Sequence, residues 1–73
     1  MPGGYSEGTE VEWDWGNGIG KGQIEQVYTR KQTLEIKGSE ITRDADEDCP
    51  AYRIKQMDGD TVLKSHSEVR KAS

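Results

Sequence analysis

The sequence has no phenylalanine, one cysteine, one histidine and no run of more than two apolar residues. With 30% apolar residues in 73, the chain builds a thin core and encloses no large cavity. An enzyme of this size would carry its catalytic groups on an open surface, where burial shifts pKa values little. The short apolar runs predict neither a transmembrane helix nor a secretory signal, and therefore a cytoplasmic protein without membrane contact.

Two single residues exclude two further chemistries. Cys49 has no second cysteine with which to form a disulfide within the chain. One cysteine and one histidine, His66, leave no ligand set for zinc. No metal and no cofactor is expected.

Basic residues are also few, since the chain has 10 of them against 14 acidic residues and a net charge of −4. The basic residues stand singly or in pairs, whereas a phosphate backbone is neutralised by clustered Lys and Arg. Global charge therefore disfavours nucleic acid. A local basic strip stays open as the alternative, and its members are Lys21, Arg30, Lys31, Lys37 and Arg43.

What the chain does have is alternation. From Thr9 to Trp15, Val11, Trp13 and Trp15 share one face and acidic residues share the other, which is typical of a half-buried strand. Similar short patterns predict four more strands, at 22–29, 34–37, 52–54 and 61–64. Ile24 and Val27 differ in parity, which indicates a bulge.

Glycine and proline positions predict the connections between these strands. Residues 1–8 are read as a flexible arm and residues 9–71 as one domain. Four glycines between Gly16 and Gly22 indicate a loop, because they weaken a regular element. Asp44 to Pro50 reads as an acidic loop, and Gly38-Ser39 as a bend within the third strand. Asp58-Gly59 predicts a type I′ hairpin turn.

The end of the chain reads as a short helical turn from Ser65 to Val69, with Ser67 as its cap. The fold class expected from these elements is all-β, a small five-stranded SH3/Tudor-like barrel, because closing a curled sheet removes its exposed edges. The predicted core consists of Val11, Trp13, Ile24, Val27, Leu34, Ile36, Ile41, Ile54, Val62 and Val69.

Several ordered motifs carry a family resemblance from Thr9 onward. They are Val11-Glu12-Trp13-Asp14-Trp15-Gly16-Asn17-Gly18, Ile36-Lys37-Gly38-Ser39-Glu40-Ile41-Thr42-Arg43, Pro50-Ala51-Tyr52, and Asp58-Gly59-Asp60 leading into Val62-Leu63-Lys64. The chain resembles the hypervirulence-associated-protein Tudor-like domain family of small bacterial and fungal proteins. The resemblance implies a Tudor-like, SH3-type barrel and supplies no catalytic residues. Cys49 stands where the family more often carries a polar residue.

Three patterns that suggest chemistry have simpler interpretations. The Gly16–Gly22 segment matches no phosphate-binding motif and precedes no helix, so a hairpin connection accounts for it better. Asp44, Asp46 and Asp48 are spaced like the start of a calcium loop, but Cys49 and Lys55 stand where that loop needs Gly and Glu. His66 adjoins serines and Glu68, and adjacent residues rarely converge in a catalytic triad.

The aromatic residues give the leading functional hypothesis. Trp15 borders the glycine segment at the barrel mouth, where Tyr28 and Tyr52 are expected to approach it. Beside the acidic residues Asp46, Glu47 and Asp48, three aromatics would suit a cationic group. The competing interpretation is that they cap the core with their polar ends in water.

The expected function is therefore a non-enzymatic binding module for a protein segment or small cationic ligand. The alternative is a small barrel that binds single-stranded nucleic acid through the five basic residues and exposed aromatics. The chain is expected to be a monomer or a weak homo-oligomer.

Overall fold

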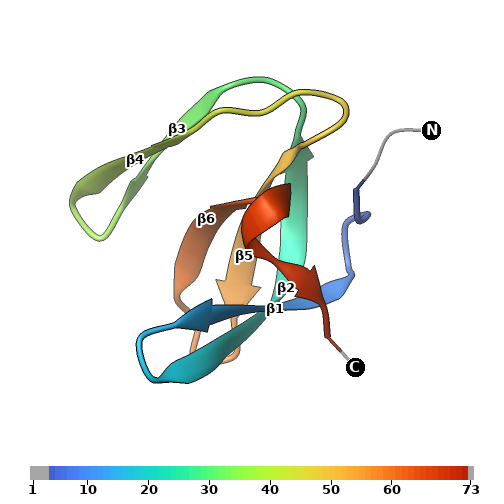
Figure 1. Cartoon of the computed structure of the whole chain (residues 1–73). Coiled ribbons are helices and arrows are strands. Elements are labelled where there is room, and N and C mark those ends of the chain that lie inside the picture. Colours follow the sequence, from blue (N-terminus) through green and yellow to red (C-terminus); the bar gives the residue numbers. More distant parts are fainter. Residues whose placement is uncertain (1–3, 73) are drawn as a thin grey trace.

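A computed structural model describes residues 4–72, which form seven β-strands and one short 3-10 helix (Figure 1). The elements are β1 (Glu10–Trp15), β2 (Gly18–Tyr28), β3 (Gln32–Ile36), β4 (Ser39–Arg43), β5 (Ala51–Gln56), β6 (Thr61–Ser65), η1 (His66–Glu68) and β7 (Arg70–Lys71). The all-β prediction is confirmed. None of the helices in residues 4–72 is long and apolar enough to cross a membrane.

The strands form two sheets, so the prediction of five strands in one closed barrel is wrong. Five strands form an antiparallel sheet in the order β6-β5-β2-β1-β7, and β3 and β4 form a separate hairpin. The two edge strands β6 and β7 follow each other in the chain with only residues 66–69 between them. Four residues span at most about 14 Å, so the sheet must curl strongly to bring its edges together. No ladder joins those edges, and the curled sheet stays open (Figure 1).

The β3–β4 hairpin is inserted between β2 and β5 and projects from the five-stranded sheet (Figure 1). The sequence analysis expected one strand here with a bend at Gly38-Ser39. Instead, Ile36 pairs with Ser39 across a two-residue turn whose central residues Lys37 and Gly38 have φ values of 52° and 77°. Positive φ at both central positions is the type I′ turn that matches the twist of the flanking strands.

The prediction of a loop from Gly16 to Gly22 holds only for Gly16 and Asn17, and it is wrong for the residues from Gly18 onward. Trp15 pairs directly with Gly18, so only Gly16 and Asn17 form the turn and β2 begins at once. A Cβ on Gly20 would lie 2.6 Å from the Trp13 ring, and one on Gly22 would lie 2.5 Å from Cγ2 of Ile54. Both glycines pair within the β2 ladders. Glycine is needed at these two positions because neighbouring atoms occupy the space that a Cβ would take.

Two smaller predictions concern local geometry in the main sheet. The predicted bulge is confirmed, since the β2–β5 register shifts between Ile24 and Gln26. The predicted hairpin at Asp58-Gly59 is present, but the prediction of a type I′ turn is wrong. The N–H of Gly59 donates to the carbonyl of Gln56 at 2.9 Å, and Gly59 alone in this turn has a positive φ, of 94°. This is the three-residue loop in which a type I turn precedes a bulge.

The helical turn after β6 is a 3-10 helix that Ser65 caps, in place of the predicted Ser67. The N–H of Ser67 donates to the Ser65 side chain, and the N–H of Ser65 donates to Oε1 of Glu68 at 2.9 Å. This reciprocal capping box ends β6 and starts the connection to β7.

The core lies on the concave face of the curled sheet. Five predicted core residues are buried there, Val11, Trp13, Ile24, Ile54 and Val69, and Val27 and Val62 pack against them. Leu34, Ile36 and Ile41 are only half-buried, because they belong to the projecting hairpin. Sequence analysis missed Ala51, Tyr52 and Leu63. Leu63 is buried but lies outside the main cluster.

Candidate functional site

An exposed tryptophan stands at the end of the β1–β2 hairpin. Alternation along β1 places Trp13 and Trp15 on one face, and Trp13 is 3% exposed whereas Trp15 is 67% exposed. Trp13 lies inside the sheet, where Gly20 makes room for its ring. Trp15 lies one residue before the Gly16–Asn17 turn, past the end of the core. A large apolar ring is thus presented to solvent on a rigid hairpin.

Trp15 borders a shallow depression of about 360 Å³ that reaches the β5–β6 turn. Its lining residues are Trp13, Trp15, Gln56, Asp58, Asp60, Val62 and Lys64. The lining thus contains two indole rings, two carboxylates and the ammonium group of Lys64. We call this depression the Trp15 site.

The carboxylates of the Trp15 site differ in their partners. Asp60 forms an ion pair with Lys37 at 2.7 Å, and this hydrogen bond raises the pKa of Lys37 above its ordinary value. Oδ1 of Asp58 accepts the N–H of Asp60 at 2.9 Å. Within residues 4–72, no basic side chain lies at ion-pair distance from Asp58. The site therefore combines an exposed ring with Asp58, and it also holds Lys64, whose Nζ lies 6.0 Å from the centroid of the Trp13 ring.

The structure does not bring together the three aromatics that the sequence analysis grouped. Trp15 pairs with Gly18 at the start of β2, and Tyr28 is the last residue of that strand. Ten residue steps along β2 lie between Gly18 and Tyr28, a length of about 33 Å measured along the strand, so the two rings stand at opposite ends of β2. Tyr52 is 0% exposed, so it lies in the core and not on a rim.

Tyr52 instead forms the buried centre of a half-buried polar cluster that sequence reasoning missed. Its hydroxyl accepts the N–H of Tyr5 at 2.8 Å and lies 2.8 Å from Nδ1 of His66. The Tyr5 and His66 rings lie 5.1 Å apart, so the three rings contact one another. Alternation did indicate the burial of Tyr52, because Tyr52 and Ile54 are two residues apart and share one face of the strand. Its contacts with Tyr5 and His66 could not be predicted, because they join distant parts of the chain.

Tyr5 belongs to the segment that the sequence analysis reads as a flexible arm. Residues 1–3 lie outside the described residues. Tyr5 packs against the main core cluster, and the N–H of Gly8 donates to the carbonyl of Ile24 at 2.8 Å. The division into an arm at 1–8 and a domain at 9–71 stays a prediction.

Burial of Tyr52 predicts a loss of stability in alkali. Desolvation raises the pKa of its phenol, against a smaller lowering by the hydrogen bond from Tyr5. The folded pKa thus exceeds the unfolded value of about 10, so the stabilisation is complete below that pH and is lost as pH rises through the folded pKa. Urea midpoints at pH 7, 9 and 11 should fall more steeply for the natural protein than for Tyr52→Phe. Equal slopes would contradict this assignment.

The acidic loop lies at the far end of the sheet from Trp15. It leads into Ala51, which pairs with Tyr28. The N–H of Cys49 donates to Oδ1 of Asp46 at 2.7 Å, which closes the loop on itself, and Asp48 is exposed. Glu47 lines a separate depression with Tyr5, Val27 and Pro50 among its walls. In residues 4–72, His, Cys, Asp and Glu side chains do not gather in threes as a metal site would require.

The five basic residues of the nucleic-acid alternative are distributed over two places. Lys21 lies on β2 opposite Glu12. The other four, Arg30, Lys31, Lys37 and Arg43, lie on or just before the β3–β4 hairpin. Lys37 is paired with Asp60, and Arg43 with Glu68 at 2.9 Å.

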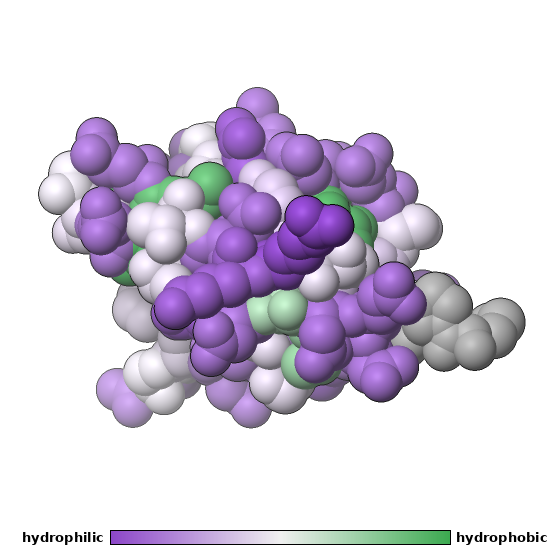
Figure 2. All heavy atoms as spheres, turned by 90° about the horizontal axis from the view of Figure 1, so that it is seen from above, coloured by the Kyte–Doolittle hydropathy of each residue, from purple (hydrophilic) through white to green (hydrophobic). Residues whose placement is uncertain are grey.

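The rest of the surface offers few comparable apolar groups. Two other large apolar side chains are strongly exposed in the described chain, Ile19 at 53% and Met57 at 92%. The face seen in Figure 2 is covered mainly by hydrophilic residues, with small and separate hydrophobic areas. Sequence reasoning found Trp15 but missed Asp58 and Asp60 beside it, since the neighbourhood depends on the strand order.

Comparison with known proteins agrees with this architecture. The family model described as hypervirulence associated proteins TUDOR domain matches residues 8–69. No curated protein and no solved structure matches the chain significantly. The matched segment contains the six longer strands, the β3–β4 hairpin and the Trp15 site. The chain therefore belongs to the family of hypervirulence-associated-protein Tudor domains.

Proposed function

We propose that the protein is a non-enzymatic binding module whose Trp15 site holds a cationic group, carried by a protein segment or by a small ligand. The observation that carries the proposal is the 67% exposed Trp15 ring beside Asp58. A cation above an indole face is attracted by the negative face of the ring, and a nearby carboxylate adds to this attraction. Family membership supports a binding role in general and names no ligand.

The strength of such a site follows from its exposure. A cation–π contact at an exposed position contributes about 0.5–1 kcal/mol. One ion pair with Asp58 in water adds a similar amount. A single cationic side chain therefore gains at most about 2 kcal/mol and binds weakly, with a Kd on the order of tens of millimolar or higher, and tighter binding needs further contacts along the segment that carries it.

The site of this proposal differs from the set derived from the sequence. It keeps Trp15 and replaces the acidic loop by the β5–β6 turn as the source of negative charge. Tyr52 is left out because it is buried, and Tyr28 because it lies at the other end of β2.

Substitution of Trp15 tests the proposal. We expect Trp15→Ala to abolish the chemical-shift changes that a methyl-lysine peptide causes at Asp58 and Asp60, while the fold is retained because the ring is mostly exposed. Ile19→Ala is the matched control. Ile19 pairs with Asp14, so it is an exposed apolar residue on the opposite face of the same hairpin.

Two outcomes would count against the Trp15 site. One is the absence of any shift in the natural protein up to about 50 mM methyl-lysine peptide, a concentration at which a gain of about 2 kcal/mol would fill a large share of the sites. The other is an equal loss of binding in Trp15→Ala and Ile19→Ala, which would mean that the hairpin as a whole, and not the indole ring, is responsible.

The nucleic-acid alternative has its own discriminating measurement. Binding to single-stranded DNA or RNA should weaken steeply with salt, because it releases counterions. Lys21 lies on β2 apart from the other four basic residues, and the chain carries a net charge of −4. We therefore expect no binding to an oligonucleotide at low salt, and salt-dependent binding would favour the alternative.

A further inference from the structure

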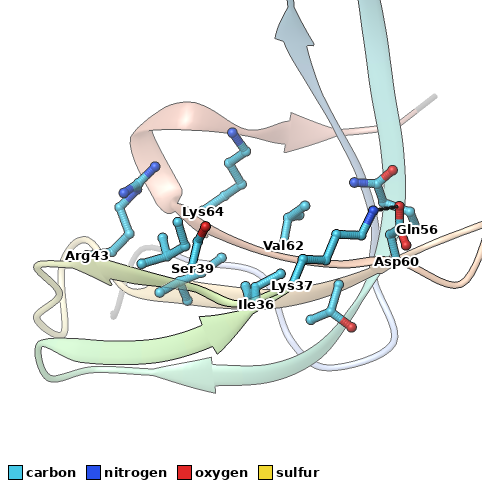
Figure 3. Close-up of a pocket in the computed structure, with 11 residues that line it drawn as sticks. Ile36, Lys37, Ser39, Arg43, Gln56, Asp60, Val62 and Lys64 are labelled. Carbon is cyan, nitrogen blue, oxygen red and sulfur yellow. Dashed lines mark hydrogen bonds and ion pairs between the residues drawn. The ribbon is translucent and has the colours of Figure 1, made fainter.

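A second hollow lies between the five-stranded sheet and the β3–β4 hairpin (Figure 3). It has a volume of about 350 Å³, and we call it the β6 groove. Its apolar lining comes from Ile36 and Ile41 of the hairpin and from Val62 and Leu63 of β6. It is a different hollow from the Trp15 site, since no hairpin residue lines the latter.

Both walls of the β6 groove are edge strands. β6 forms a ladder with β5 alone, β4 forms a ladder with β3 alone, and β4 packs near β6 without a ladder between them. The groove is therefore bounded by backbone that is not engaged in strand pairing on that side. An exposed strand edge is the structure to which an extended peptide adds as a further strand.

The register shows which β6 residues present their backbone to the groove. Gln56 donates to the carbonyl of Asp60, and His66 donates to the carbonyl of Pro50. Hydrogen-bonded and non-bonded pairs alternate in an antiparallel ladder, so the residues at odd positions point their N–H and C=O away from β5. Thr61 and Leu63 are two of these, and the N–H of Ser65 confirms the pattern by donating to Glu68.

The groove is positively charged although the chain carries a net charge of −4. Its lining includes three basic residues, Lys37, Arg43 and Lys64, and one acidic residue, Asp60. In Figure 3 the labelled basic side chains stand around the apolar floor. An added strand with acidic side chains would complement them.

The existing partners of these cations are weakly held. The Lys37–Asp60 and Arg43–Glu68 pairs connect the hairpin to the main sheet, and their side chains are between 35% and 69% exposed. Exposed ion pairs of this kind contribute about 0–1 kcal/mol each. Carboxylates on a ligand can therefore replace them at little cost.

We propose that the β6 groove binds an extended peptide segment of alternating apolar and acidic residues, which adds as a strand to the outer edge of β6. Its apolar side chains contact Ile36, Ile41 and Val62. Its carboxylates pair with Lys37, Arg43 and Lys64. Its backbone hydrogen-bonds to Thr61 and Leu63. The ligand charge and the binding mode differ from those of the Trp15 site, although the two hollows share Gln56, Asp60, Val62 and Lys64 in their linings.

Matched peptides test this proposal on the unmodified protein. A peptide of about eight residues that alternates Glu with Val should bind and should protect the Thr61 and Leu63 amides from hydrogen exchange. The same peptide with Lys in place of Glu should bind at least about tenfold more weakly. The Glu/Val peptide methylated at alternate backbone nitrogens keeps its charge but cannot donate to β6, and it should lose both binding and protection.

Variants locate the site. The double variant Lys37→Gln, Arg43→Gln should bind the Glu/Val peptide about tenfold more weakly. The control variant Lys21→Gln, Lys55→Gln, whose residues lie outside the groove, should change the affinity by less than about twofold. Trp15→Ala should leave the affinity for the Glu/Val peptide unchanged. A failure of the β6 groove proposal can therefore be told apart from a failure of the Trp15 site.

Three results would overturn the proposal. They are equal binding of the Glu and Lys peptides, binding of the methylated peptide with unaltered affinity, and protection of Thr61 and Leu63 in the free protein through dimerisation, measured by sedimentation. The last result would assign the groove to a second copy of this chain.

Discussion

Tyr52→Ala is expected to remove a large part of the protein's stability at 25 °C and to lower its urea midpoint sharply. The side chain is 0% exposed and its ring contacts those of Tyr5 and His66, with centroids 6.0 and 5.9 Å away. Truncating a buried aromatic residue to alanine removes about 3–5 kcal/mol. A domain of this size has about 4–11 kcal/mol of total stability, so the loss takes a large part of it. Urea unfolding followed by circular dichroism measures the change.

The Tyr52→Phe variant separates the ring from the hydroxyl. It keeps the packed volume but leaves the N–H of Tyr5 and Nδ1 of His66 without their shared partner. We expect a smaller loss, of about 1–3 kcal/mol, and a transition that stays cooperative. If Tyr52→Ala unfolds at the same urea concentration as the natural protein, the residue does not lie in the core.

Gly22→Ala is expected to lower the free energy of unfolding by about 1–3 kcal/mol or more, although alanine is the smallest change possible. The added Cβ would lie 2.5 Å from Cγ2 of Ile54 and 2.7 Å from the carbonyl oxygen of Lys55. The second atom belongs to the backbone of the paired strand β5, so it cannot rotate away. The strands must separate or the register must shift, and the urea midpoint should fall accordingly.

Gly18→Ala is the matched control in the same strand. A Cβ at Gly18 meets no atom within 4 Å, and its φ is not positive. We expect a change within about 0.5 kcal/mol, as for other surface substitutions. A Gly22→Ala variant as stable as Gly18→Ala would show that β2 and β5 do not approach each other at this point.

Much of the secondary structure was readable because alternation is a local property. Val11, Trp13, Ile24 and Ile54 were predicted to be buried from the spacing of apolar residues, and they are. The glycines of β2 were misread for a physical reason. Glycine weakens a strand when nothing opposes it, but Gly20 and Gly22 face a tryptophan ring and a paired strand that only glycine admits.

The candidate site was predictable only in part. Trp15 follows from its place beside the turn, where alternation carries it past the end of the core. The sequence did not predict its separation from Tyr28, because β2 begins within the segment for which the glycine pattern predicts a loop. Tyr52 shares one face of its strand with the buried Ile54, so its spacing indicated burial, whereas its contacts with Tyr5 and His66 depend on the tertiary structure.

By itself the sequence determined an all-β chain with a thin core, short strands and turns at its glycines, since these depend on the order of apolar and polar residues. The tertiary structure decided which strands are neighbours. It placed Asp58 beside Trp15, left β4 and β6 as facing edges, and kept the curled sheet open. Alternation fixes the face to which each side chain points, but the pairing partner of each strand depends on contacts between residues far apart in the chain.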